Sequence, residues 1–335
     1  MKRMRLRFVG NIEVDFVDRE QALKRVEDWA ERGTRLVQVV FGPEGCGKSA
    51  WLKQSAELLK ELGFDVIYVD PLRRDFIVYT DLREVVKDLA EAAADIIGRA
   101  EVRLATLAID LVKYALKRGR KKIAVLVDDA FQAIGLDRAA TYVKGLLGLI
   151  EYPPADYERI VTVVATSEGV SKREIGRHYW ADLRPIWNMP IEGFRELYNQ
   201  LPGDKPNFEE VWRLTGGNPR ILSDLYQKGW RVEELVNEII YKKGVGEFIS
   251  SLDKDKLEVL AKAVEDPDVL LSKEGINLLD KLVELNLVVD IPPKREPWFW
   301  IDAPPAEKDL ELGIGRDVAW QTPLHREAVR RAFEE

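Results

Sequence analysis

Residues 42–49 restrict the fold of this 335-residue chain more than any other segment. They read Gly-Pro-Glu-Gly-Cys-Gly-Lys-Ser and fit the pattern Gly-x-x-x-x-Gly-Lys-Ser/Thr. A β-branched and aromatic run precedes them over residues 37–41, and apolar residues at helical spacing follow over 50–62. The sequence therefore predicts a buried strand, a tight glycine-rich turn and a helix in succession.

The residue types in this turn indicate a site for phosphate. The glycines allow several backbone N–H groups to turn toward one anion. Lys48 is placed to reach the β- and γ-phosphates of a nucleotide, and the Ser49 hydroxyl is placed to ligate Mg²⁺. A helix that begins at Lys48 adds the positive end of its dipole. An ordinary glycine-rich turn is the simpler alternative.

Further apolar runs at about residues 65–69, 123–127 and 160–165 predict three more buried strands. Helical segments are expected at 18–31, where Asp18 is the candidate N-cap of a capping box with Gln21, and over most of 81–117 with a break near Gly98. Strands that alternate with helices predict a layered α/β domain with a parallel sheet.

Beyond about residue 191 the sequence is mostly helical. Segments 194–201, 207–214, 219–228 and 232–242 read as successive short helices, and helical sequence continues over 251–285. Extended segments are expected at 287–291, 298–301 and 318–320, which together with the helices predict a winged-helix module. We therefore expect a core at 1–192, a helical lid at 193–248 and a winged helix at 249–335.

Composition excludes several kinds of protein. Cys46 is the single cysteine, so intrachain disulfides and cysteine-based zinc sites are excluded, and two histidines make a histidine metal centre improbable. No apolar run approaches the roughly 18 to 20 residues that span a bilayer, and no signal-like stretch follows the basic start, so a cytoplasmic location is expected. The acidic excess lies after residue 245, which disfavours contact with phosphate backbones there.

Two carboxylates at the end of the run 125–127 indicate hydrolysis. Asp128 is expected to hold Mg²⁺ from the side opposite Ser49, and Asp129 to act as the base that polarises the attacking water. Thr166 and Ser167, at the end of the next strand, are candidates to sense the γ-phosphate, although hydroxyls at strand ends also form turns. Carboxylates that merely end a strand are the alternative for the acidic pair.

These pieces resemble the archaeal ATPase family of the STAND and AAA+ branch of P-loop NTPases. Residues 16–20 resemble the family's entry motif, where the backbone passes close to adenine, and 217–219 resemble the Gly-x-Pro motif whose proline packs on adenine. The resemblance covers roughly residues 14–290 and implies a five-stranded parallel sheet, a helical lid and a winged helix. It implies that ATP or ADP contacts Val17, Arg19, Pro43, Glu44, Gly45, Cys46, Gly47, Lys48, Ser49, Ala50 and Pro219.

The chain departs from the family pattern at two places. Asp129 stands where the family most often has Glu, which predicts slow hydrolysis, and Glu168-Gly169 replaces an arginine that often follows the sensor hydroxyls. The arginine for the γ-phosphate is then sought among Arg173, Arg177, Arg184 and Arg220, and Arg220 is preferred because it follows the Gly-x-Pro motif. The catalytic set expected is Lys48, Asp129, Thr166, Ser167 and Arg220.

Three functions stay open at this point. The first is an ATP-driven conformational switch that acts on an unidentified protein partner. The second is an initiator-like ATPase that binds DNA through its winged helix, although the expected recognition helix, 275–286, carries Asp280 and Glu284 beside Lys281. The third is a nucleotide-binding scaffold without turnover. The basic run 117–122 is interpreted as a solvated loop, and the aromatic residues 298–300 as packing on their own domain.

Overall fold

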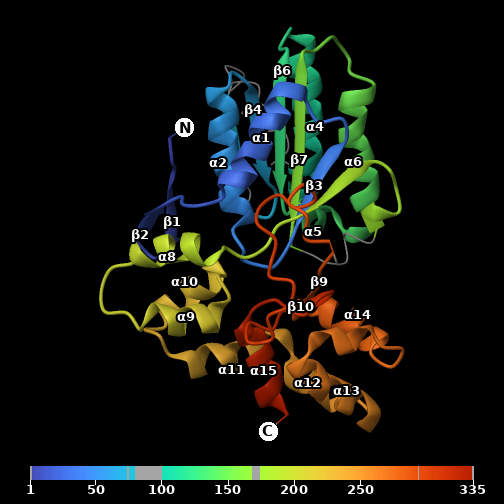
Figure 1. Ribbon diagram of the computed structural model, residues 1–335. Helices are drawn as coiled ribbons and strands as arrows, with labels where there is room; N and C mark the ends of the chain where they lie inside the picture. The colour runs from blue at the N-terminus through green and yellow to red at the C-terminus, as the bar shows by residue number, and fades with distance from the viewer. Residues whose placement is uncertain (1, 74, 80–99, 168–173, 293, 334–335) are drawn as a thin grey trace. The chain divides into compact units, whose positions relative to one another are not determined.

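The computed structural model describes residues 2–73, 75–79, 100–167, 174–292 and 294–333 (Figure 1). The chain forms two compact units, each built from segments that are distant in sequence. Unit 1 consists of Met1–Arg3, Glu20–Phe41 and Lys48–Arg184, and unit 2 of Met4–Arg19, Gly42–Gly47 and Pro185–Glu335. The division into three domains at residues 192 and 248 stays a prediction.

Unit 1 is organised around a six-stranded sheet with the strand order β5-β4-β6-β7-β3-β8. Its centre is formed by the four predicted strands, β3 (Val37–Phe41), β4 (Asp65–Asp70), β6 (Lys122–Asp128) and β7 (Arg159–Thr166). Each pair of neighbours among these four is parallel. Their side chains are almost all buried, as expected of strands that are covered on both faces.

The sheet has one strand more than the five expected, and its two edge strands had not been located in the sequence. β5 (Asp75–Tyr79) runs antiparallel to β4. Only residues 71–74 separate the two strands, too few for the crossover that a parallel connection requires. β8 (Ala181–Pro185) lies next to β3, and its sequence contains no β-branched residue that would have indicated a strand.

Helices cover both faces of this sheet (Figure 1). α1 (Glu20–Arg32) and α2 (Lys48–Glu61) pack on one face, while α4 (Ala100–Lys117), α5 (Ala130–Ile134) and α6 (Leu136–Glu151) cover the other. The expected N-cap Asp18 is wrong: α1 begins at Glu20, and Asp18 has a φ of 60° instead of the extended backbone of an N-cap. The helical sequence expected over 81–99 lies outside the described residues.

Unit 2 begins with a hairpin, β1 (Arg5–Val9) and β2 (Ile12–Asp15), which was not predicted. The four expected lid helices are present as α8 (Ile191–Asn199), α9 (Phe208–Thr215), α10 (Pro219–Gln227) and α11 (Val232–Lys243). The start of α10 is fixed by its sequence. Asn218 caps it by accepting from the N–H groups of Arg220 and Ile221, and Pro219 occupies the first turn, where its missing N–H costs nothing.

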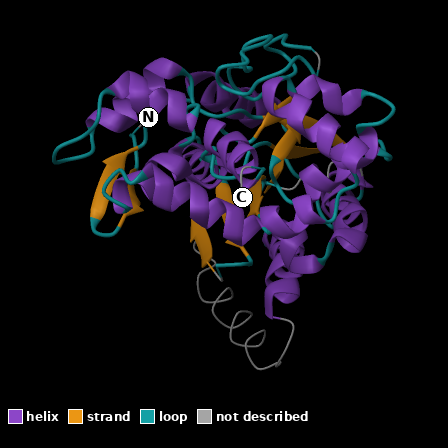
Figure 2. Ribbon diagram, turned by 90° about the horizontal axis from the view of Figure 1, so that it is seen from below, coloured by secondary structure: helices purple, strands orange, loops and turns teal. Residues whose placement is uncertain are grey.

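The remainder of unit 2 is helices followed by a two-stranded wing, as predicted. It contains α12 (Val245–Ser250), α13 (Lys254–Glu265), the 3₁₀ turn Pro267–Leu271, α14 (Ile276–Glu284), β9 (Val288–Asp290), β10 (Val318–Trp320) and α15 (Pro323–Ala332). β9 and β10 pair antiparallel. The predominance of helix over strand is plain in Figure 2.

The strand expected at residues 298–301 is wrong. This segment forms a turn in which Phe299 N–H donates to Glu296 O, and the buried indole of Trp300 donates to Lys294 O at 2.9 Å. The aromatic residues are therefore held by local loop contacts instead of strand pairing. Trp300 is 1% exposed and packs on its own unit as expected, whereas Trp298 is 59% exposed.

Candidate functional site

The residues singled out by sequence are divided between the two units. Lys48, Ser49, Asp128 and Asp129 belong to unit 1, with Thr166 and Ser167. The glycine-rich residues 42–47, together with Val17, Arg19, Pro219 and Arg220, belong to unit 2. The boundary falls within the phosphate motif, at the peptide bond between Gly47 and Lys48.

In unit 1, α2 begins at Lys48, as the motif predicts, so Ser49 and Ala50 lie in its first turn. The N–H groups of a first turn have no partner within the helix, and the helix dipole places partial positive charge there. The Lys48 side chain is buried and contributes to the electrostatics of Asp129. The start of α2 therefore has the polarity that an anion requires.

Asp128 ends β6 and is 1% exposed. Its Oδ2 accepts from the Tyr68 hydroxyl at 3.2 Å, and the Ser49 hydroxyl also hydrogen-bonds its carboxylate. Among the residues that the structure describes, no donor reaches its Oδ1. Burial, reinforced by the charge of Asp129, raises the pKa of Asp128 to about 6.

These observations fit a divalent cation. A buried carboxylate oxygen without a donor is satisfied by a cation or by its bound water, and the adjoining Ser49 hydroxyl is an oxygen ligand of the kind Mg²⁺ prefers. No cluster of three or more acidic, histidine or cysteine side chains suited to a metal occurs in the part of the chain that is described. Proteins usually bind Mg²⁺ through one or two side chains together with nucleotide phosphates.

Asp129 follows β6 in the left-handed conformation, with a φ of 45°, and is the residue before α5. Its N–H donates to Ala165 O at 3.0 Å, and its Oδ1 accepts from the Ser167 hydroxyl at 3.5 Å. Burial raises the pKa of this carboxyl, opposed by the positive charge of Lys48. A non-glycine residue in this conformation costs of order 1 kcal/mol or more and is common at functional sites.

The sensor candidates lie where strand ends meet. Thr166 is the last residue of β7, is buried, and pairs in register with Phe41, which directly precedes the phosphate motif. Ser167 contacts Asp129 as described. The structure thus brings the hydroxyl of Ser167 to the candidate base.

A third carboxylate, Asp70, was missed. It ends β4, is 1% exposed, and raises the pKa of both Asp128 and Asp129 through its charge. Asp70 accepts from Arg73 N–H at 3.0 Å. The signal that identified Asp128, an acidic residue at the end of a buried apolar run, was equally present in the sequence at Asp70.

In unit 2, the lid helix α10 contacts the glycine-rich turn. The N–H of Arg220 donates to Gly45 O at 3.3 Å, and a Cβ on Gly45 would lie 2.2 Å from Arg220 Cβ. Gly45 and Gly47 have φ values of 77° and 101°, which other residues rarely adopt. The ring of Pro219 lies about 4.0 Å from the position of a Cβ on Gly47. The close approach of Arg220 and the positive φ together allow only glycine at position 45.

Side chains from distant parts of unit 2 also hold this turn. Glu44 donates its N–H to Gln321 Oε1 at 2.9 Å, accepts at its carbonyl from Asn218 Nδ2 at 2.9 Å, and forms an ion pair with Lys243 at 2.9 Å. Asn218 also donates to Asn188 Oδ1 at 2.8 Å. Sequence reasoning missed Asn188, Lys243 and Gln321, which have no distinguishing pattern around them.

Arg19 was expected near the nucleotide, and its side chain is 3% exposed. Its guanidinium donates to Asp302 Oδ2 at 2.7 Å, Cys46 O at 2.7 Å and Trp187 O at 2.9 Å. Val17, two residues earlier, packs against the lid core that contains Phe194. The Arg19 guanidinium is therefore engaged by other groups of unit 2.

The described arginines that were considered for the γ-phosphate form pairs with nearby side chains. Arg220 Nε forms an ion pair with Asp224 at 3.1 Å, and the Arg220 side chain is 66% exposed. In unit 1, Arg177 pairs with Glu174, and Arg184 with Asp182 and Gln38. Arg173 lies outside the described residues.

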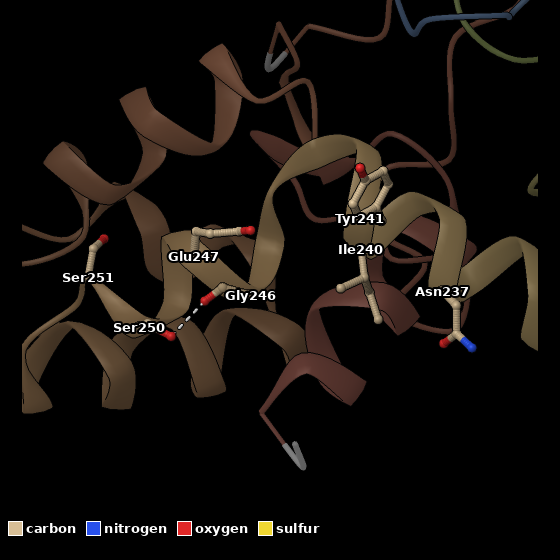
Figure 3. Close-up of a pocket in the computed structure, with 7 residues that line it drawn as sticks. All are labelled: Asn237, Ile240, Tyr241, Gly246, Glu247, Ser250 and Ser251. Carbon is tan, nitrogen blue, oxygen red and sulfur yellow. Dashed lines mark hydrogen bonds between the residues drawn. The ribbon is translucent and has the colours of Figure 1, made fainter.

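A separate pocket of about 680 Å³ lies on α11 and α12 (Figure 3). Its lining consists of Asn237, Ile240, Tyr241, Gly246, Glu247, Ser250 and Ser251, and Ser250 donates to Gly246 O. None of these residues belongs to the phosphate motif or carries one of the candidate catalytic groups, so this pocket is distinct from the site described above.

A family model described as an ATPase domain predominantly from Archaea matches residues 16–225, more than half of the chain. The chain belongs to this archaeal ATPase family. Membership makes it an ATP-hydrolysing enzyme and confirms the resemblance drawn from the motifs. The match includes the entry motif, the phosphate motif, the acidic strand end and Pro219. No curated protein matches the ATPase significantly.

Several solved structures match the chain at low sequence identity. The ORC2 protein of Aeropyrum pernix, in ADPNP and ADP complexes, is 14% identical, with 94% of this chain and 94% of that chain covered and a TM-score of 0.40. The ORC1 protein of the same organism, in complex with DNA, is 18% identical, with coverage of 95% and 92% and a TM-score of 0.38. AMPPCP-bound DnaA from Aquifex aeolicus is 17% identical, with coverage of 76% and 74% and a TM-score of 0.39. Scores this low do not show that these chains and the ATPase share a function.

Within the described residues, no helix of the ATPase is both long enough and apolar enough to cross a membrane.

Proposed function

We propose that this ATPase is a slow, Mg²⁺-dependent conformational switch that passes the state of its nucleotide to a protein partner. One observation carries the proposal: the glycine-rich turn is held by the lid helix α10 and by residues near the wing. Asn218 and Arg220 bond the carbonyls of Glu44 and Gly45, and Gln321, next to β10, accepts from Glu44 N–H. A change at the phosphates then acts directly on elements of the C-terminal region.

The chemistry assigned to each residue follows from its environment. Lys48 and the first turn of α2 bind the β- and γ-phosphates, and Ser49 and Asp128 hold Mg²⁺, which neutralises charge on the phosphate oxygens. Asp129 accepts the proton of the attacking water. Its short side chain is held by Ser167 and reaches less far than Glu, so turnover is slow.

Arg220 is the arginine that responds to the γ-phosphate in this proposal. Its backbone adjoins Gly45, while its exposed side chain pairs with Asp224 one helical turn away. Breaking an exposed ion pair costs about 0.2 to 1 kcal/mol, so the guanidinium is free to turn to a stronger anion. Pro219, at the first position of the same helix, is assigned to the adenine ring.

DNA binding by the winged helix is the less favoured function. α14, the expected recognition helix, carries Lys281, which pairs with Glu284 on the same helix at 2.8 Å. A lysine that is neutralised by its neighbour contributes little to binding a phosphate backbone. Duplex binding that weakens steeply with salt would favour DNA over the protein partner.

Hydrogen exchange in two nucleotide states tests the switch. Asp129→Asn loaded with ATP and Mg²⁺ should differ from the ADP form in the protection of α10 and of residues 318–322, because both segments contact the glycine-rich turn. Lys48→Ala, which removes the phosphate-binding amine, should show no difference between the two nucleotides. Equal protection in Asp129→Asn with ATP and with ADP would contradict the switch.

A further inference from the structure

Three successive carbonyl groups of the glycine-rich turn are each held by a donor in unit 2. Glu44 O accepts from Asn218 Nδ2, Gly45 O from Arg220 N–H, and Cys46 O from the Arg19 guanidinium. The described residues contain no cis peptide, and in a trans peptide the C=O and the following N–H point in opposite directions. Holding these carbonyls therefore fixes the direction of the next three N–H groups.

The peptide between Cys46 and Gly47 is the most firmly held of the three. Its carbonyl makes the shortest of these contacts, 2.7 Å, and its donor is the only charged one. The N–H of Cys46 closes a turn on Pro43 O at 3.3 Å, so the N–H of Gly47 is the one whose direction depends on Arg19. A charge-assisted hydrogen bond is about twice as strong as a neutral one.

Arg19 can hold this carbonyl because its other end is fixed. The guanidinium is planar and presents its donors in a rigid fork, so a partner on one nitrogen sets the position of the other. Asp302 is that partner: it bonds Nη1 at 2.7 Å, while Nη2 donates to Cys46 O and to Trp187 O. Both side chains are almost fully buried, at 3% and 4% exposed, although 283 residues separate them.

We propose that Asp302 is a positioning residue for nucleotide phosphates. Through Arg19 it orients the Cys46–Gly47 peptide so that the Gly47 N–H faces the phosphates, which links the segment between β9 and β10 to the affinity of the phosphate motif. The inference rests on the proposed function, in which nucleotide phosphates bind at residues 42–49. Asp302 lies beyond residue 225, where the family match ends.

Calorimetric titration with ADP tests this assignment. Asp302→Asn keeps the shape and removes the charge, and should weaken ADP binding about tenfold to a hundredfold, the range expected for a charge-assisted hydrogen bond. Asp268→Asn is the matched control. Asp268 is a carboxylate of the same unit that accepts from the N–H groups of Arg316, Asp317 and Val318, so its loss should lower the unfolding temperature and leave ADP affinity within twofold.

Arg19→Lys separates positioning from simple loss of a buried charge pair. Lysine retains the ion pair with Asp302 but lacks the rigid fork that also holds the carbonyl. We expect an unfolding temperature near that of the wild type and an ADP affinity reduced as in Asp302→Asn. Wild-type ADP affinity in either variant overturns the assignment.

Lys48→Ala, titrated in parallel, distinguishes failure of the proposed phosphate site from failure of the role proposed for Asp302. If Lys48→Ala fails to bind ADP while Asp302→Asn binds it as the wild type does, the phosphate site stands and the role of Asp302 is refuted. If Lys48→Ala binds ADP with wild-type affinity, the phosphate site itself is refuted.

Discussion

Tyr68 donates its hydroxyl to Asp128 Oδ2 across adjacent parallel strands, at 3.2 Å. Tyr68 is fully buried in β4, and its bond occupies one carboxylate oxygen while Oδ1 is left without a donor among the described residues. The tyrosine therefore sets which oxygen of Asp128 is available to a cation.

Tyr68→Phe should weaken the binding of divalent cation to the ADP complex. The change removes one hydrogen bond that orients the carboxylate. A typical hydrogen bond contributes about 1 kcal/mol net, so we expect about a three- to tenfold higher half-saturating concentration. Manganese titration followed by electron paramagnetic resonance measures it. Tyr142→Phe is the control, because the buried Tyr142 hydroxyl bonds Ala105 O elsewhere in unit 1. A similar loss in both variants would mean that the effect is structural.

Asp128→Asn should stabilise the protein without nucleotide or metal at neutral pH. Burial raises the pKa of Asp128 to about 6, so between about pH 4 and 6 the folded state holds more proton than the unfolded chain. The stability that this group contributes is therefore present at low pH and lost as the pH rises through about 6. Asparagine carries no charge, and at pH 7.5 its variant should be about 1 to 3 kcal/mol more stable.

Urea denaturation at pH 7.5 and at pH 4 checks this prediction. The difference between Asp128→Asn and the wild type should shrink toward zero at pH 4, where Asp128 is protonated in the folded protein. A variant that is less stable than the wild type at both pH values would contradict it.

Asp129→Asn should bind ATP and lose most of its hydrolysis. Removal of a general base typically costs a factor of about 10² to 10⁴ in rate. Single-turnover hydrolysis, measured together with ATP affinity, distinguishes chemistry from binding. Asp137→Asn, an exposed acidic side chain of α6 that is paired with Arg138, should hydrolyse ATP at the wild-type rate. Wild-type turnover in Asp129→Asn would exclude it as the base.

Gly45→Ala should disrupt the contact between the glycine-rich turn and the lid helix. The new Cβ would lie 2.2 Å from Arg220 Cβ, and the φ of 77° is strained for alanine. We expect loss of nucleotide binding and a destabilisation of about 2 kcal/mol or more. Gly229→Ala controls for the strain alone, since Gly229 has a φ of 61° and nothing within 4 Å of a Cβ. Equal losses in the two variants would assign the effect to the backbone.

Sequence predicted the parts of the structure that repeat a local pattern. The strands β3, β4, β6 and β7 are buried on both faces, so each is a continuous apolar run, and the lid helices show apolar residues at helical spacing. The edge strand β8 has no such run. The segment 298–301 resembled a strand in sequence, because burial of Trp300 in a loop and burial in a sheet select the same side chains.

The part of the candidate site that lies at the carboxyl ends of strands could be predicted from the sequence. The carboxyl ends of parallel strands meet at one edge, so Asp128, Thr166 and Ser167 were placed correctly near one another, and the same reasoning applies to Asp70. Gln321 and Asp302 could not be found in this way. Their contacts to Glu44 and Arg19 span 277 and 283 residues and depend only on the tertiary fold.

The discontinuous make-up of unit 2 has a consequence for synthesis on the ribosome. Domains generally fold as units, with N-terminal parts first, and all segments of unit 1 have been synthesised once residue 184 has been added. The glycine-rich turn belongs instead to a unit that needs Asp302 and Gln321. With the role proposed for Asp302, a nascent chain acquires its sheet early and its full nucleotide affinity only after residue 321 has been added, so a shorter chain is a poor competitor for ATP.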